Sequence, residues 1–546
     1  MNGQELLKSY DRNGTLGELT GCQPRAQESF FRRARSRAQE QLQRARRRAA
    51  AEKQVVEIDA SRLSGTNGGD HWLVQPDGRC RRRLQPFPTA EQLLLADRQR
   101  PPACRPCPDL DRARPLLLRC AYDGLWSPSG TNWQPVRTVE LPPALMSRLA
   151  GRPVAGCGLA VLAPPRYQSI LSDIAALAGL DPAARAEWID PGIWLEVACL
   201  AARARGWRLE PREADGPDGV AAALARQLPA GAEIRPALEA GGLRLLSLLE
   251  AWQGDDLARD DELPGGLVPS DFDRLVEARS TQRVADPAGQ LPPAVLEQMW
   301  SESLRACGGA GVQVAMPVFT WHDEFPAQVG RAMHAGIDDL LKRLDAESLR
   351  RQLARMGGAD IPDDAAALPA VAVPGHLRRR LEQQGLYRPQ AGLLVDRRGR
   401  PLDCSRLLKL VRLVTRSFGK YFLRFRNTHP LLGVITLGPE AQDEHGFRLV
   451  GRLVARMGLL ARARGYTSII KSGPLEIAGR EIARLLDEGG LLAPGWKPVL
   501  TFQVGLPLGP DDPVCAGESD EHDGLTERLL DRRSTRVALA ERYFIS

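Results

Sequence analysis

The chain has 546 residues and a formal net charge of +7, with 43% hydrophobic and 26% charged residues. This composition is typical of a soluble globular protein, and the length predicts two to four domains. The positive charge comes almost wholly from arginine, which is common throughout the sequence together with Ala, Gly, Leu and Pro. The charge is therefore not a specific sign of nucleic-acid binding.

The N-terminal residues 1–22 are polar, without the apolar stretch of a secretory signal, and no apolar run reaches the roughly 20 residues that span a bilayer. The ten cysteines are scattered along the chain, which is typical of reduced thiols. Cys80, Cys104, Cys107 and Cys120 offer four thiolates for zinc, but they lack the second tightly spaced pair that a structural zinc site uses. The sequence predicts a cytoplasmic protein with no metal and no membrane association.

Residues 1–85 are predicted to be a basic, helical N-terminal extension. Residues 27–53 favour a helix with almost no apolar stripe, as in helices that are exposed or pack on a partner. Residues 54–85 hold a short β-prone run and a glycine-rich turn. A solvated helix is favoured over a nucleic-acid-binding arm, because charge runs are usually solvated faces.

A first folded unit is predicted over residues 86–265, where amphipathic helices alternate with apolar runs. The predicted helices cover 89–100, 167–178 and 193–205, with a further helix from about 110. A strand is predicted at 154–163, and an apolar run at 243–249 precedes a polar linker at 253–266. Gly206 is the expected C-cap of the third helix.

The same order of elements restarts at Asp273, so a second copy is predicted over residues 266–546. Its apolar run at 429–438, helix at 448–466 and strand at 467–470 parallel the strand and glycine-capped helix of the first unit. An Ala/Pro/Arg-rich insertion at about 340–405 extends this copy. Internal duplication indicates the fold more strongly than any short motif does.

The segment 128–135, PSGTNWQP, carries the most informative arrangement of polar groups. Gly130 lets the backbone approach a flat ligand closely. Ser129, Asn132 and Gln134 supply hydrogen-bond donors and acceptors along one short turn. Such a turn can bind the edge of a heterocycle, and a polar turn without a ligand is the alternative.

This segment resembles the Pro-Ser-Gly-x-Asn-x-Gln-Pro signature of the nitroreductase superfamily, a family of FMN-dependent oxidoreductases, with Val136 where the family prefers Trp. The second copy has lost the pattern at 307–313. By resemblance, the flavin ring would be held by Pro128, Ser129, Gly130, Asn132 and Gln134.

A second part of the family pattern is an Arg-Ser turn after an N-terminal helix, suited to the FMN phosphate because guanidinium and hydroxyl groups donate to it. The second copy retains a form of this turn at Arg279, Ser280 and Arg283, with Ala and Gln at two positions where arginines are expected. In the first copy the turn at 97–101 is degraded, since the serine is gone and an acid has entered.

The third part is a late strand and glycine-rich loop with a basic residue, for which the resemblance suggests Lys471 and Gly473. Near the end of the chain, Arg532 and Arg533 begin the string RRSTR, which resembles both the family's opening phosphate turn and its closing basic segment. A helix C-terminus with capping arginines is the alternative, because cations are favoured there.

The resemblance implies an α+β fold in which two tandem nitroreductase-like units, each a mixed β-sheet flanked by helices, form an intramolecular pseudo-dimer. Family members are usually homodimers whose two FMN sites lie at the interface and draw on both subunits. Here the first copy keeps the ring turn and the second keeps the phosphate turn. The fused pair should therefore assemble one complete FMN site and one degenerate site.

The resemblance implies an FMN-dependent enzyme that transfers electrons from NAD(P)H to an organic acceptor, with a small molecule or a peptide as substrate and no binding of nucleic acid. FMN would carry the chemistry, so no catalytic side chain is assigned. Two alternatives remain. One is a lidded flavin-binding or storage protein, or a dedicated flavin dehydrogenase without general reductase activity. The other is a cofactor-free interaction protein with a nucleic-acid-binding N-terminal helix.

Overall fold

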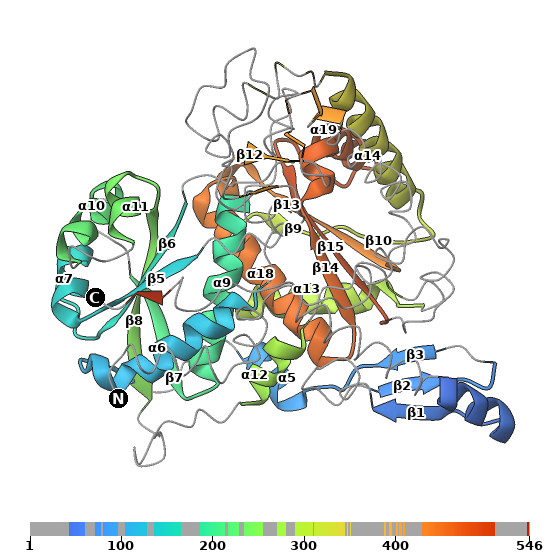
Figure 1. Ribbon diagram of the computed structural model, residues 1–546, viewed down its shortest axis with the longest axis horizontal. Helices are drawn as coiled ribbons and strands as arrows, with labels where there is room; N and C mark the ends of the chain where they lie inside the picture. The colour runs from blue at the N-terminus through green and yellow to red at the C-terminus, as the bar shows by residue number, and fades with distance from the viewer. Residues whose placement is uncertain are drawn as a thin grey trace.

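The computed structural model describes the chain in segments, and Figure 1 shows their arrangement. The described residues are 43–59, 71–77, 80–96, 104–127, 136–164, 186–212, 217–228, 234–254, 270–279, 285, 290–309, 311–343, 345, 347, 350, 387–388, 393–395, 400–401, 403, 405–406, 408–409, 429–507 and 543–544. The helix predicted at 167–178 and most of the insertion at 340–405 lie outside them.

The first sheet is built from strands within the predicted first unit. Its strands are β4 (Cys104–Pro106), β5 (Arg137–Leu141), β6 (Gly158–Ala163), β7 (Trp207–Arg212) and β8 (Arg244–Gly254). The helices around it are α5 (Pro88–Leu95), α6 (Leu110–Leu125), α7 (Pro143–Ala150), α9 (Ala186–Arg203), α10 (Pro217–Gln227) and α11 (Arg235–Glu239). Strand β6 is buried on both faces, so its sequence GLAVLA is continuously apolar or small.

The second sheet follows in the second half of the chain. Its strands are β9 (Val314–Ala315), β10 (Val318–Thr320), β13 (Leu431–Leu437), β14 (Thr467–Lys471) and β15 (Lys497–Gly505). The helical elements of this half are α12 (Asp271–Ala278), α13 (Pro293–Ala306), α14 (Glu324–Arg343), the 3-10 turn η6 (Pro439–Ala441), α18 (Glu444–Ala463) and α19 (Gly473–Glu488). A two-residue hairpin pair, β11 (Tyr387–Arg388) and β12 (Leu393–Leu394), is described within the insertion.

The main strands of both sheets are connected in the same spatial order. Across the first sheet these strands lie in the order β5-β6-β8-β7, and across the second in the order β10-β13-β15-β14. In each set of four, the strand that comes last in the sequence lies between the two strands that precede it in the sequence. The last strand of the chain, β16 (Tyr543–Phe544), pairs in parallel with β5. The predicted boundary at 265/266 therefore separates the two sheets except at the C-terminal end, which crosses to the first sheet.

Each sheet lies between two helical layers, and the two inner layers pack against each other to form the largest core (Figure 1). Alternate residues of β6 point to opposite faces, with Leu159 and Val161 in the shared core and Ala160 and Leu162 in a separate outer core. The outer core of the first sheet is covered by α7, α10 and α11, and that of the second by α14 and α19.

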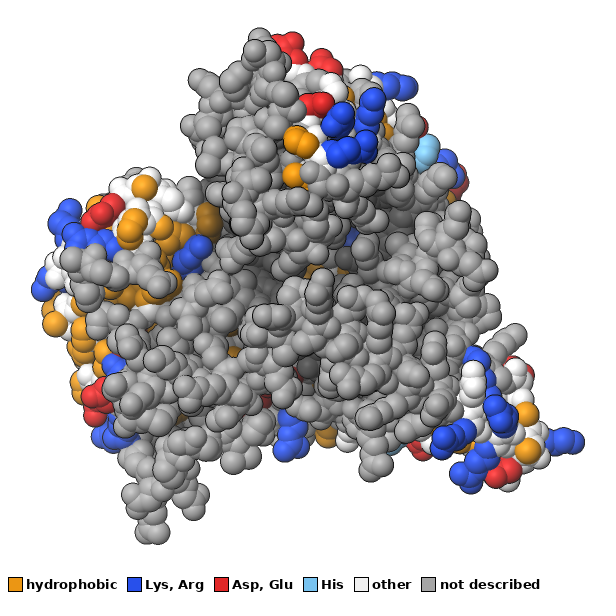
Figure 2. Space-filling view, viewed as in Figure 1, with side chains coloured by type: hydrophobic (Ala, Val, Ile, Leu, Met, Phe, Trp, Pro, Cys, Tyr) orange, Lys and Arg blue, Asp and Glu red, His pale blue; other side chains and the backbone are white. Residues whose placement is uncertain are grey.

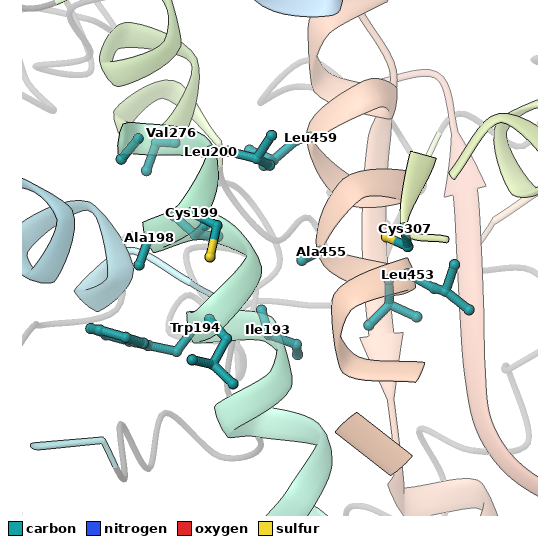
Figure 3. Packing of buried hydrophobic residues seen from close by; sticks show 14 of the residues in the cluster. Ile193, Trp194, Ala198, Cys199, Leu200, Val276, Cys307, Leu453, Ala455 and Leu459 are labelled. Carbon is teal, nitrogen blue, oxygen red and sulfur yellow. The ribbon is translucent and has the colours of Figure 1, made fainter. Parts of the chain in front are cut away.

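Helices α9 and α18 lie side by side at the centre of the molecule, with buried hydrophobic side chains along both (Figure 3). The two helices approach most closely at two glycines. A Cβ atom built on Gly192 would lie 2.4 Å from the carbonyl oxygen of Arg448, and one on Gly451 would lie 2.1 Å from that of Ile189. The two contacts are reciprocal, since each glycine faces the residue three positions before the other glycine. Only glycine allows the two backbones to approach this closely.

The two long central helices begin differently from each other. Helix α18 starts after Asp443, whose Oδ1 accepts a hydrogen bond of 2.8 Å from the Gly446 N–H, and it is followed by Gly465 at φ +83°. Helix α9 was predicted over residues 193–205, but it already runs from Ala186 and contains Pro191. Buried residues along α9 pack against α18 and α6, so tertiary packing accommodates a proline that the local sequence places at a helix start.

The N-terminal part forms a small module with its own core. Helix 43–52 lies on a three-stranded antiparallel sheet of β1 (Val56–Asp59), β2 (His71–Val74) and β3 (Cys80–Arg83). The helix was predicted to be exposed or to pack on a partner, and in this part Ala45 and Ala49 are buried against Val74 of the adjoining sheet. Two alanines one turn apart make a stripe too narrow to stand out in the sequence. Figure 2 shows Lys and Arg side chains gathered on the visible face of this module.

None of the helices in the described segments is long and apolar enough to cross a membrane.

Candidate functional site

The candidate site lies where the C-terminal end of α6, from the first half, meets the C-terminal end of α12, from the second half. Trp126 is the C-cap of α6 and stands two residues before Pro128. Arg279 is the C-cap of α12, is 8% exposed, and its Nη2 donates a hydrogen bond of 3.1 Å to the Trp126 carbonyl oxygen. The structure therefore places Arg279 beside Trp126, which lies two residues before the predicted ring turn.

A buried cluster of charges stabilises this junction. Arg119 on α6 lies 2.9 Å from Asp123 on the same helix and 3.5 Å from both Asp273 and Glu277 on α12. Arg205, just after α9, pairs with Asp273 as well. Asp273 also closes a capping box with Ser270, which begins α12 at this position. The cluster sets the position of α12, and hence of Arg279, relative to α6.

The carboxyl groups of Asp123 and Asp273 titrate differently. Burial raises the pKa of Asp123 to about 8, and a hydrogen bond to Asp273 acts in the same direction. The pKa of Asp273 is lowered, against its own desolvation, by the charges of Arg119 and Arg205. Asp123 is therefore the protonated member of the pair near neutral pH and Asp273 the carboxylate.

Sequence reasoning did not assign any role to this cluster. Arg119 and Asp123 are four residues apart on one predicted helix, a spacing that favours an ion pair. That spacing is the only signal the sequence carries, because the partners Asp273 and Glu277 are about 150 residues away in the chain.

A second buried ion cluster lies between the two central helices. Glu196 of α9 is fully buried between two arginines of α18: Arg452 Nε lies 2.8 Å from its Oε2 and Arg456 Nε lies 2.5 Å from its Oε1. Arg452 Nη2 also donates to the Cys307 carbonyl oxygen at 3.3 Å, and Arg456 donates to that of Leu94. These contacts connect the C-terminal ends of α5 and α13.

Two further predicted site residues, Lys471 and Gly473, lie at the end of β14 and at the start of α19. Lys471 ends β14 opposite Thr501, and its carbonyl oxygen accepts a hydrogen bond of 2.7 Å from the Thr501 hydroxyl. Ala285, just after the predicted phosphate turn, contacts the other end of β15 at Gly505. Thr501 and Gly505 are four residues apart along β15, which corresponds to roughly 13 Å. Gly473 follows at the start of α19.

The other predicted site residues lie outside the described residues, and their assignment stays a prediction: Pro128, Ser129, Gly130, Asn132, Gln134, Ser280, Arg283, Arg532 and Arg533.

The cysteines considered for zinc are placed in different surroundings. Cys104 is on β4, Cys107 lies beside Cys157, and Cys120 is buried in α6. In the described segments no group of three or more His, Cys, Asp or Glu side chains is arranged to hold a metal ion.

Three comparisons with known proteins give a limited result. No protein-family model matches the sequence, and no curated protein is significantly similar to it. Among solved structures, the FMN- and NADPH-dependent nitroreductase NfnB from Sphigopyxis sp. strain HMH is 17% identical, with a TM-score of 0.29, over 49% of this chain and 95% of that protein. NfnB from Mycobacterium smegmatis, solved with NADPH, is 13% identical, with a TM-score of 0.27, over 48% and 92%.

A presumed nitroreductase from Anabaena variabilis is 11% identical, with a TM-score of 0.30, and matches 78% of this chain and all of that protein. These neighbours are nitroreductases, but similarity at this level carries no conclusion about the activity of this chain.

Proposed function

We propose that this chain is an FMN-binding oxidoreductase of the nitroreductase type, in which two tandem units form an intramolecular pseudo-dimer with one functional flavin site. The observation that carries the proposal is the contact between Arg279 and the Trp126 carbonyl oxygen, which connects the two halves of the chain. Arg279 and Trp126 adjoin, in the sequence, two turns that separately resemble the phosphate-binding and ring-binding parts of one FMN site.

The pseudo-dimer is supported by correspondences between the halves. The sheets share one strand order, and α9 and α18 cross through the reciprocal contacts of Gly192 and Gly451. Arg205 and Arg464, at the ends of these helices, make matching bridges. Arg205 bridges α12 with α6, and Arg464 bridges α5 with α13 through Glu91 and Glu302. Each arginine thus joins a helix of its own half to the first helix of the other half, as an approximate two-fold axis requires.

The chemistry of the described donor fits an FMN phosphate. A guanidinium carries five N–H donors in a planar fork that suits phosphate oxygens. Arg279 presents this fork from a buried position beside the predicted ring turn, and the Arg119–Asp273 cluster holds its helix in place. Bound FMN would supply electron transfer between a nicotinamide donor and an organic acceptor. Within this proposal, Arg279 binds the phosphate and the 128–135 turn orients the ring.

The proposal of one flavin follows from the asymmetry between the two pseudo-equivalent positions. If Gly192 corresponds to Gly451, then Ile193 and Val197 correspond to Arg452 and Arg456, and Ala455 corresponds to Glu196. The second position thus holds a buried ion triad where its counterpart has apolar side chains. Buried charges this well paired are costly to separate, so the triad disfavours a ligand there.

The stoichiometry of flavin tests the proposal. The purified chain, incubated with FMN and desalted, should release one FMN per chain on denaturation, measured by absorbance against protein concentration. NADPH and NADH oxidation with a nitroaromatic or quinone acceptor then separates a general reductase from a flavin protein restricted to a dedicated substrate. Two FMN per chain would refute the closed second position, and none would refute the flavin assignment.

A further inference from the structure

Strands β4 and β6 meet end to end along one edge of β8, although 51 residues of sequence separate them. Most of the residues of β8 that pair with β7 also pair with β4 or β6. Because a strand has two edges, β7 lies along one edge of β8, and β4 and β6 lie along the other. At the junction the Cys157 N–H donates a hydrogen bond of 2.7 Å to the Cys107 carbonyl oxygen, and both residues bond to Ala251. Cys107 and Cys157 are therefore direct backbone neighbours.

The side chains of these two residues also meet. The sulfur of Cys107 lies 3.4 Å, and that of Cys157 3.7 Å, from the carbonyl oxygen of Asp109. The two thiols hydrogen-bond to each other, and both are free and buried, at 4% and 0% exposure. Because the two thiols already lie within hydrogen-bonding distance of each other, only a small movement of the side chains is needed to reach the S–S bond length of about 2 Å.

The environment of Cys107 differs from that of Cys120, another buried cysteine. The hydrogen bond from Cys157, helped by the positive charge of Arg112, lowers the pKa of Cys107 to about 7. Burial instead raises the pKa of Cys120 far above its usual value. At Cys107 the hydrogen bond from Cys157 outweighs the effect of burial, and a thiol with a lowered pKa forms the nucleophilic thiolate near neutral pH.

We propose that Cys107 and Cys157 form a reversible, peroxide-driven disulfide that fastens β4 to β6. The Cys107 thiolate attacks one oxygen of hydrogen peroxide, which breaks the O–O bond, gives the sulfenic acid and releases hydroxide. The Cys157 sulfur then attacks the Cys107 sulfur, and its thiol proton and the sulfenic hydroxyl leave as water. Two thiols are oxidised and one peroxide is reduced to two waters in total, and a dithiol reductant such as dithiothreitol reverses the bond.

The position of this bond would tie it to α6. Asp109, whose carbonyl contacts both sulfurs, is also the N-cap of α6 and accepts hydrogen bonds from the Asp111 and Arg112 amides. The disulfide would thus fix the start of the helix whose other end bears Trp126. The inference does not depend on the proposed flavin function.

Peptide mapping tests the disulfide directly on the full chain. The protein is exposed to graded hydrogen peroxide, its remaining thiols are alkylated in denaturant, and unreduced protease digests are analysed by mass spectrometry. The peptide linked through Cys107 and Cys157 should exceed any other cysteine pairing by at least about tenfold, because thiolate character directs oxidation. Reduction with dithiothreitol should remove it.

Serine variants give the matched controls. Cys107→Ser and Cys157→Ser should abolish the linked peptide, whereas Cys104→Ser and Cys199→Ser should retain it. Full alkylation of Cys107 and Cys157 in the oxidised wild-type protein would overturn the proposal, as would a link from Cys107 to Cys104. Because mapping of the wild-type chain decides between these outcomes, the proposal remains testable even where a serine variant does not fold.

Discussion

Arg279 is the described residue on which the proposed flavin site depends most directly. Its guanidinium is buried, and it already bonds to the backbone at the entrance to the ring turn. A charge-assisted hydrogen bond contributes about 1.5–3 kcal/mol net. We therefore expect Arg279→Ala to weaken FMN binding at least tenfold, measured by fluorescence titration of the flavin.

A matched control for this variant is Arg98→Ala, in the degraded turn of the first copy, which should leave the FMN affinity unchanged. The unfolding midpoint of each variant is measured alongside, since Arg279 also contributes a structural hydrogen bond. Equal loss of affinity in both variants would contradict the division of roles between the copies.

Asp123 predicts a pH dependence of stability. Its pKa is about 8 in the folded protein and near 3.8 without the fold, so the folded state holds an extra proton between these values. The stability that this proton contributes is complete below pH 3.8 and is lost as the pH rises towards 8. Asp123→Asn, which stays neutral, should lose less unfolding free energy between pH 6 and 8, by on the order of 1 kcal/mol.

Denaturant unfolding of both proteins at pH 5 to 9 measures this difference. Asp111→Asn serves as control, because Asp111 is an exposed carboxylate on the same helix and pairs with Arg114. Parallel pH profiles for the wild type and Asp123→Asn would show that the folded protein does not hold this proton.

At the scale of elements, the crossing of α9 and α18 determines how closely the two halves pack. A methyl group on Gly451 would overlap the Ile189 carbonyl oxygen, and neither rigid backbone can yield easily. We expect Gly451→Ala to cost about 3 kcal/mol of unfolding free energy, since overpacking a well-filled core forces the backbone to shift. Chemical denaturation monitored by tryptophan fluorescence gives the value.

Gly473→Ala is the matched control for the crossing. A Cβ atom at Gly473, in the first turn of α19, meets no atom within 4 Å, so the change should stay within about 0.5 kcal/mol. Similar losses in both variants would mean that the helix crossing is not the point of close approach.

At the scale of the whole molecule, the N-terminal module has its own small core of Ala45, Ala49 and Val74, separate from the core shared by the two halves. Deletion of residues 1–83 should therefore leave the flavin content per chain unchanged. Absorbance of the purified deletion protein checks this expectation. Tight, salt-sensitive DNA or RNA binding by the full chain that disappears on deletion would instead favour the nucleic-acid alternative.

The sequence predicted much of the local structure. The apolar run LLGVITL predicted β13, and the glycine-ended helix before TSII predicted most of α18, because burial on both faces and helix capping leave clear local patterns. The restart of the element order at Asp273 predicted a second unit, and the two sheets do share one strand order. The start of α9 was missed because packing against α18 outweighs the local preference of Asp-Pro-Gly.

The amino-acid sequence by itself determined the elements, their repeated order and the two turns that resemble parts of a flavin site, since periodicity and short polar turns are local properties. Only the tertiary structure decided which of these parts meet. The approach of Arg279 to Trp126, the Glu196 ion triad and the pairing of Cys107 with Cys157 each join residues from 50 to 260 positions apart. Such contacts depend on the close crossing of two helices and the register of one sheet, which no single segment encodes.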